Sequence, residues 1–249
     1  MNTAVTGVTA ATPAVDTVRY SADGQLLDIH RAAAPDAPTV LLWHGRGPAE
    51  RDVLGSLAAD VARLGATVVV PDWRPDADHG GRPHLEASLR FVHDLVRDSG
   101  SPVTLAGWSL GARAAMATAL RPDPPHGWRP AAVVGVAGRY NQPEPLLGLP
   151  SPMDVCAGAP PLPIHLVHGT GDTVCDFANA LAFQAVLSGH GRDVPLTRLD
   201  TDHPGAVMAE YDPELGRCRP AEAPVPRREG LRTARVIAET ALATTAPAA

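Results

Sequence analysis

The sequence predicts an α/β protein with a mostly parallel central sheet and helices on both faces. Short, continuous apolar runs, such as residues 39–43 and 67–70, alternate with longer segments in which apolar residues recur every three or four positions. Apolar runs of this kind are typical of strands buried on both faces, and the longer pattern is typical of helices that cover such a sheet. A chain of 249 residues has the length of one domain of this class.

The first part of the chain supplies the expected edge of this sheet. Residues 1–16 read as a flexible tail, and residues 17–245 as a single domain. Two extended runs, 17–21 and 25–31, flank a short connection that contains Gly24, which predicts a β-hairpin. After the strand at 39–43, the periodicity predicts helices over 53–64 and 85–96, separated by the strand at 67–70.

The second part continues the alternation with one irregular excursion. Strands are predicted at 131–137, 164–169 and 194–199, with a helix from about 177 to 189. Residues 138–163 are rich in proline and too short for a helical cap domain, so we expect a minimal, loop-like cap. Residues 211–219 read as a small hairpin or loop, the Pro-rich stretch 220–226 as a connector, and residues 229–243 as a final helix.

Composition excludes several classes of protein. The net charge is −6, and all 21 basic residues are arginine without an evident cluster, so no nucleic-acid partner is expected. The three cysteines are too few and too scattered for a disulfide framework or a zinc site. Neither a signal peptide nor a membrane-spanning run is evident, and we therefore expect a cytoplasmic protein without a membrane partner. The oligomeric state does not follow from the sequence.

The segment 103–115 carries the strongest chemical signal. An apolar run leads into Gly107-Trp108-Ser109-Leu110-Gly111, and an alanine-rich helical segment follows. A serine in a tight turn between a strand and a helix is held in a strained conformation that exposes its hydroxyl. Small residues two positions before and after it let the strand and the helix pass closely, and Gly107 and Gly111 occupy those positions.

An acid and a histidine follow the serine along the chain, each in a loop after its own predicted strand. Asp172 lies in the loop after the predicted strand 164–169, and His203 lies in the loop after the predicted strand 194–199. Asp200 and Asp202 are alternative acids, but they flank His203 in the same loop. Asp72 precedes Ser109, which is the wrong order for the acid in a fold with this strand–turn–helix serine motif.

At these three motifs the chain resembles the α/β-hydrolase superfamily, in its esterase/lipase-like branch, over about residues 17–245. The resemblance implies that Ser109 is the nucleophile, His203 the general base and Asp172 the orienting acid. It also implies an oxyanion hole formed by the backbone amides of Arg46 and Leu110, with Gly47 as the second choice to Arg46. The loop 44–48 differs from the His-Gly-Gly-Gly form of one large esterase branch.

Residues that follow the predicted strands are candidates for the wall of a substrate pocket. These are Trp43, Gly47, Trp108, Arg139 and Tyr140. A metal site formed by Asp78, His79 and His84 is conceivable, but their spacing matches no known ligand pattern, and a solvated loop is the preferred interpretation. We therefore expect neither a metal nor an organic cofactor.

These observations predict a serine hydrolase that cleaves a small-molecule carboxylic ester through an acyl-enzyme intermediate. A thioesterase or an amidase with the same residues is the neighbouring alternative. A hydrolase-fold protein that binds a ligand without converting it is the alternative from another class. The sequence does not identify the substrate or the length of its acyl chain.

Overall fold

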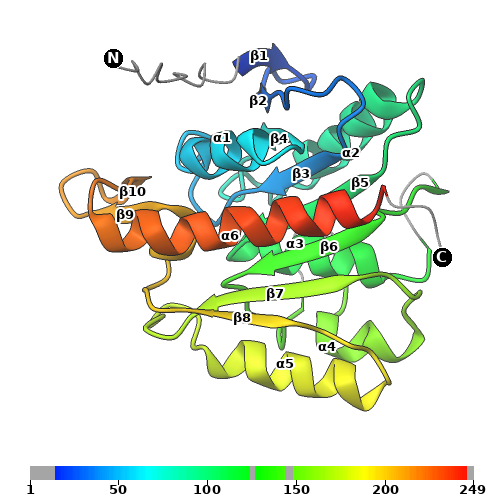
Figure 1. Ribbon diagram of the computed structural model, residues 1–249, viewed down its shortest axis with the longest axis vertical. Coiled ribbons are helices and arrows are strands. Elements are labelled where there is room, and N and C mark those ends of the chain that lie inside the picture. The colour runs from blue at the N-terminus through cyan, green and yellow to red at the C-terminus, as the bar shows by residue number, and fades with distance from the viewer. Residues whose placement is uncertain (1–14, 124–126, 144–147, 246–249) are drawn as a thin grey trace, which may run out of the picture.

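A single twisted sheet of eight strands runs through the molecule in the order β1-β2-β4-β3-β5-β6-β7-β8 (Figure 1). The computed structural model describes residues 15–123, 127–143 and 148–245. Strands β1 and β2 form an antiparallel hairpin, β2 pairs antiparallel with β4, and all later pairs are parallel. The strands are β1 (Val15–Arg19), β2 (Leu26–His30), β3 (Thr39–Trp43), β4 (Thr67–Pro71), β5 (Val103–Trp108), β6 (Ala132–Val136), β7 (Ile164–Gly169) and β8 (Leu196–Leu199).

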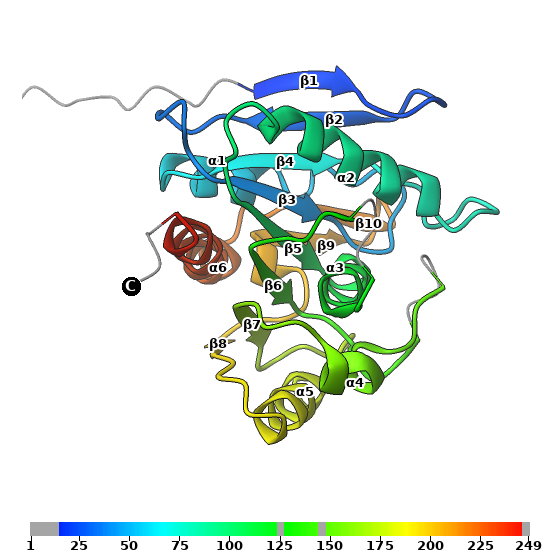
Figure 2. The same ribbon diagram turned by 90° about the vertical axis from the view of Figure 1, so that its right-hand side faces the viewer.

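Helices cover both faces of this sheet, as the sequence predicts. Helices α1 (Gly55–Arg63) and α6 (Pro224–Ala243) lie on one face (Figure 2). The other face carries α2 (Arg82–Val96), α3 (Leu110–Leu120), the short α4 (Pro152–Val155) and α5 (Ala178–Gly189). In the described part of the chain, no helix combines the length and the apolar character needed to traverse a bilayer.

Two hydrophobic cores result, one on each face of the sheet. Successive side chains of a strand point to opposite faces. In β3, Leu41 and Trp43 belong to the core beneath α2, α3 and α5, whereas Val40 and Leu42 belong to the core beneath α1 and α6. The continuous apolar character of β3 is therefore required, because both of its faces are buried.

The structure departs from the sequence prediction in three places: β1 begins at Val15, inside the predicted tail 1–16, α4 lies inside the predicted cap loop 138–163, and α6 begins earlier than predicted. A second, two-stranded sheet of β9 (Ala209–Asp212) and β10 (Arg217–Pro220) forms the predicted hairpin. Helix α6 begins at Pro224 rather than at residue 229, because proline at the first helical position lacks only an amide hydrogen that would have no partner there. Residues 1–14 of the predicted tail and residues 144–147 of the predicted cap loop lie outside the described residues.

The parallel strands bring the predicted site residues to one edge of the sheet. The carboxyl ends of β3, β5, β6 and β7 are in register with one another, and the loops that follow them carry Arg46, Ser109, Arg139 and Asp172. His203 follows β8 at the same edge. In open parallel sheets this edge is where ligands bind.

Candidate active site

Ser109 occupies a sharp turn between β5 and α3. Its backbone angles are φ 57° and ψ −115°, a conformation that residues other than glycine rarely adopt. The amide of Ser109 donates a hydrogen bond to the carbonyl oxygen of Val136 at 2.9 Å, which holds the turn against β6. A Cβ on Gly111 would lie 2.3 Å from the carbonyl oxygen of His44, so glycine is required where α3 passes the end of β3.

We expect Ser109→Gly to be more stable than Ser109→Ala by about 1 kcal/mol. Backbone strain at such a residue costs about 1–3 kcal/mol, and the entropy of glycine offsets about 0.5–1 kcal/mol of the gain. Neither variant has the hydroxyl group, so the comparison isolates the backbone. Urea unfolding of the two proteins measures the difference, and a more stable alanine variant would show that Ser109 is not strained.

Asp172 and His203 form a closely bonded pair beside the pocket that contains Ser109. The Nδ1 of His203 lies 2.7 Å from Oδ2 of Asp172, and the other carboxylate oxygen accepts the amides of Val174 and Cys175, each at 2.8 Å. Burial raises the pKa of Asp172, but hydrogen bonds from His168 and His203 outweigh it and hold this pKa well below its usual value. Because an ionised Asp172 accepts the Nδ1 proton, Nε2 of His203 is the nitrogen that can accept another proton.

His168 is a second histidine on the same carboxylate, and the sequence analysis did not assign it a role. Its Nε2 lies 2.6 Å from the carbonyl oxygen of Cys175 and 3.2 Å from Oδ2 of Asp172, with no exposed surface. It thereby ties the end of β7 to the loop that carries the acid. The only signal in the sequence is its position four residues before Asp172.

Two backbone amides at the turn are free to face an anion. Among the described residues, the amides of Arg46 and Leu110 have no hydrogen-bond acceptor, and Leu110 is the first residue of α3. The amide of Gly47, in contrast, donates to the carboxyl group of Glu50, whose pKa is raised by burial. The geometry therefore favours Arg46 over Gly47 as the second amide donor beside Ser109.

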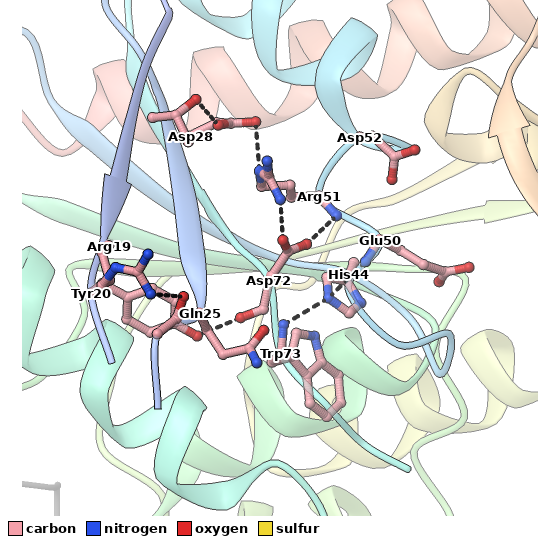
Figure 3. A network of polar contacts seen from close by, with 12 residues as sticks. Arg19, Tyr20, Gln25, Asp28, His44, Glu50, Arg51, Asp52, Asp72 and Trp73 are labelled. Carbon is pink, nitrogen blue, oxygen red and sulfur yellow. Dashed lines mark hydrogen bonds and ion pairs between the residues drawn. The ribbon is translucent and has the colours of Figure 1, made fainter. Parts of the chain in front are cut away.

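A buried polar network fixes the loop that carries Arg46 (Figure 3). Arg51 forms ion pairs with Asp28 and with Asp72, and its amide donates to Asp72 at 3.0 Å. His44 accepts the amides of Trp73 at 3.1 Å and of Glu50 at 3.3 Å through Nε2. Asp72 is thus a structural residue, and it is remote from the Asp172–His203 pair in the topology of the sheet.

The neutral form of His44 is required in this network, which makes the protein sensitive to acid. Burial lowers the pKa of His44 to about 3, against about 6.5 in an unfolded chain. Between these values the unfolded state binds a proton that the native state does not, so stability is expected to fall as the pH falls from about 6.5 towards 3. Unfolding free energies at pH 7, 6 and 5 measure this decline. The decline should be shallower in His44→Gln, and an equal slope would contradict the assignment.

A pocket of about 1020 Å³ opens beside Ser109. The residues that the sequence analysis placed here and that line the pocket are Arg46, Gly47, Trp108, Ser109, Leu110, Arg139 and His203. Asp172 lies behind His203. Cys175 also lines the pocket, and the nearby hydroxyl group of Ser109 acts to lower the pKa of its thiol.

Two predicted pocket residues, Trp43 and Tyr140, lie in the hydrophobic core instead, and that prediction is wrong. Trp43 is fully buried, and its indole nitrogen donates to the hydroxyl group of Ser88 at 3.0 Å. Tyr140 is also fully buried and stacks on Phe183, with ring centroids 4.5 Å apart. Both rings belong to the hydrophobic core on the face of the sheet that α2, α3 and α5 cover.

The sequence analysis missed one wall of the pocket altogether. The hairpin of β9 and β10 folds over the pocket mouth and contributes Tyr211, Leu215, Arg217 and Cys218. Tyr211 and Leu215 are 60% and 62% exposed, so two large apolar side chains border the entrance. The hairpin is anchored by an ion pair of 2.7 Å between Arg217 and Asp52.

The histidines of the polar loop do gather, but around Asp23 rather than Asp78. Potential ligand atoms of Asp23, His79 and His84 lie within 4.8 Å of one another. In each histidine, however, Nδ1 accepts a backbone amide, from Gly81 in His79 and from Arg74 in His84. Each Nε2 therefore carries the proton, and His84 donates it to Asp23 at 2.7 Å. This arrangement suits a hydrogen bond from a neutral histidine that anchors the β1–β2 turn better than a metal site.

Comparisons with known proteins bear on the fold. No protein-family model matches the sequence, and the search of curated proteins gave no significant match. Among solved structures, the chain is similar to esterase 2 of Thermogutta terrifontis phosphoramylated by tabun (TM-score 0.71, 16% identity, covering 97% of this chain and 99% of that one). The butyrate-bound form of that esterase is also similar (TM-score 0.69, 16% identity, 96% and 98% covered).

A truncated carbohydrate esterase from gut microbiota is a third similar structure (TM-score 0.64, 14% identity, 93% and 98% covered). The likeness extends over nearly the whole chain in all three comparisons, and it agrees with the mostly parallel eight-stranded sheet. The fold of this chain is therefore the α/β-hydrolase fold.

Proposed function

We propose that the protein is a serine hydrolase that cleaves carboxylic esters. Ser109 is the nucleophile, His203 the general base and acid, and Asp172 the residue that orients His203. The observation that carries the proposal is the position of Ser109 on a strained turn in the same pocket as a histidine whose Nδ1 is bonded to a buried carboxylate. The similar structures that are esterases add support at the level of the fold.

The reaction follows from these groups. As the Ser109 oxygen bonds to the ester carbonyl carbon, its proton passes to Nε2 of His203, and the carbonyl oxygen becomes an anion. The amides of Arg46 and Leu110 donate to that oxyanion. Collapse of the intermediate releases the alcohol, which takes the proton from His203 and leaves an acyl group on Ser109. Water then repeats the sequence, with His203 again as the base, and releases the acid.

Asp172 contributes without a change in its own protonation. Its lowered pKa keeps it ionised at neutral and mildly acidic pH. It therefore stabilises the imidazolium that forms when His203 takes the serine proton. The amides of Val174 and Cys175 hold the carboxylate in place and fix the plane in which His203 is bonded.

Hydrolysis of p-nitrophenyl esters from acetate to palmitate tests this proposal, with the wild type and Ser109→Ala compared side by side. A rate that depends on Ser109 is expected, with a preference for short acyl chains because the butyrate-bound neighbour belongs to the same fold. A fluorophosphonate probe should label the wild type but neither Ser109→Ala nor His203→Ala. Absence of both labelling and turnover would contradict the proposal and favour binding without catalysis.

A further inference from the structure

Two arginine side chains lie on opposite sides of Ser109 at the pocket. In the sheet, β5 lies between β3 and β6. Arg46 follows β3, Ser109 follows β5, and Arg139 follows β6, so the order of the strands places one guanidinium on each side of the serine. Both arginines line the pocket.

Neither guanidinium is neutralised by a carboxylate of the described chain. The ion pairs among the described residues include neither Arg46 nor Arg139, whereas Arg217 at the same pocket pairs with Asp52. Arg139 donates from one terminal nitrogen to the carbonyl oxygen of Val174 at 2.7 Å. This bond fixes the group at the pocket wall and leaves its charge uncompensated.

The other charged residues at the pocket leave its net charge positive. Glu50 is the single carboxylate among the described lining residues, and it accepts the amide of Gly47. Burial and the nearby charge of Asp172 raise the pKa of Cys175, which lies beside Ser109, whereas the charges of Arg139 and Arg113 act to lower it. The pocket is thus positive within a protein of net charge −6, an arrangement that concentrates anions at the site.

We propose that the substrate is an ester that carries a carboxylate within a few bonds of its carbonyl group, and that Arg46 and Arg139 bind this carboxylate. The inference rests on the proposed ester hydrolysis and names its substrate class. A planar guanidinium binds a carboxylate through two parallel hydrogen bonds, which fixes the position of the ester as well as its charge. The side chain of Arg46 acts here, while its backbone amide faces the oxyanion.

Pairs of esters that differ only in charge test the proposal. The mono-p-nitrophenyl ester of succinic acid has a carboxylate in its acyl part, and p-nitrophenyl 4-oxopentanoate is its neutral counterpart. Butyrate esters of 4-hydroxybenzoic acid and 4-hydroxyacetophenone make the same comparison in the alcohol part. We expect kcat/KM to favour the anionic member of at least one pair by about tenfold or more, and to lose this preference as salt is added.

Substitutions of the two arginines test whether they cause the preference for anionic esters. Arg46→Gln and Arg139→Gln should each reduce the ratio of kcat/KM on the anionic ester to kcat/KM on its neutral counterpart by about tenfold. Arg90→Gln removes the same charge from an exposed position on α2 and should change neither rate. Equal rates on both members of each pair, or a preference that survives both pocket substitutions, would overturn the proposal.

Binding without turnover separates this proposal from the proposed activity. Glutarate is the probe, and calorimetric titration of Ser109→Ala measures its affinity. Binding that weakens when Arg46→Gln or Arg139→Gln is added supports the anion site even if no ester is hydrolysed. Hydrolysis of neutral esters that depends on Ser109, together with no glutarate binding, would retain the enzymatic activity and refute the anion site.

Discussion

Asp172→Asn is expected to reduce kcat on a p-nitrophenyl ester by about 10,000-fold without loss of the folded state. The asparagine oxygen can still accept the amides of Val174 and Cys175, so its NH₂ group faces His203. His203 must then accept at Nδ1 and carry its proton on Nε2, and that tautomer cannot take the proton of Ser109. Steady-state kinetics measure the loss, and circular dichroism verifies the fold.

The matched control is Asp202→Asn, in the loop that carries His203. Asp202 accepts the amide of Gly205 at 3.0 Å, a bond that asparagine retains, so kcat should change by no more than a few-fold. A large loss in Asp202→Asn combined with a small loss in Asp172→Asn would transfer the role of the acid to Asp202.

Gly111→Ala is expected to cost at least about 3 kcal/mol of stability and to abolish activity together with the native turn. The added Cβ would lie 2.3 Å and 2.4 Å from the carbonyl oxygens of His44 and Trp43, which are backbone atoms at the end of a buried strand. Relief of this contact requires α3 to move away from β3, and Ser109 and Leu110 would move with it. Urea unfolding and ester hydrolysis measure the two effects.

Gly189→Ala provides the control for this substitution. Gly189 is the last residue of α5, and a Cβ there would meet no atom within 4 Å. The stability of the Gly189→Ala protein should stay the same or rise slightly, because alanine has a higher helix propensity than glycine. If Gly111→Ala were as stable as Gly189→Ala, the close packing of α3 against β3 would be refuted.

The sequence predicted the parts of the fold that depend on local patterns. The strands and the turn at Ser109 follow from short apolar runs and from two glycines whose spacing is dictated by the turn itself. The positions of Asp172 and His203 at the same edge follow because parallel strands place their carboxyl ends together. These inferences need only the order of the residues along the chain.

The sequence could not predict contacts that depend on the direction in which side chains point. β3 is apolar on both faces, so its pattern does not indicate that Trp43 points away from the pocket. Asp72 pairs with Arg51, which lies 21 residues earlier in another loop, and not with Arg74, which lies only two residues away. Arg74 pairs with the exposed Asp76. The sequence predicts only a small hairpin or loop at residues 211–219, and that the hairpin folds over the pocket depends on its packing.

The same hairpin separates the residues that border the pocket entrance from the residues proposed to react. The proposed reacting groups follow the strands of the main sheet, whereas Tyr211 and Leu215 belong to an appended ribbon with its own small sheet. Arg219 braces this ribbon internally through ion pairs with Glu210 and Asp212. Selection can therefore remodel the entrance of the pocket by exchanging one short segment, while the chemistry of the sheet edge is inherited unchanged.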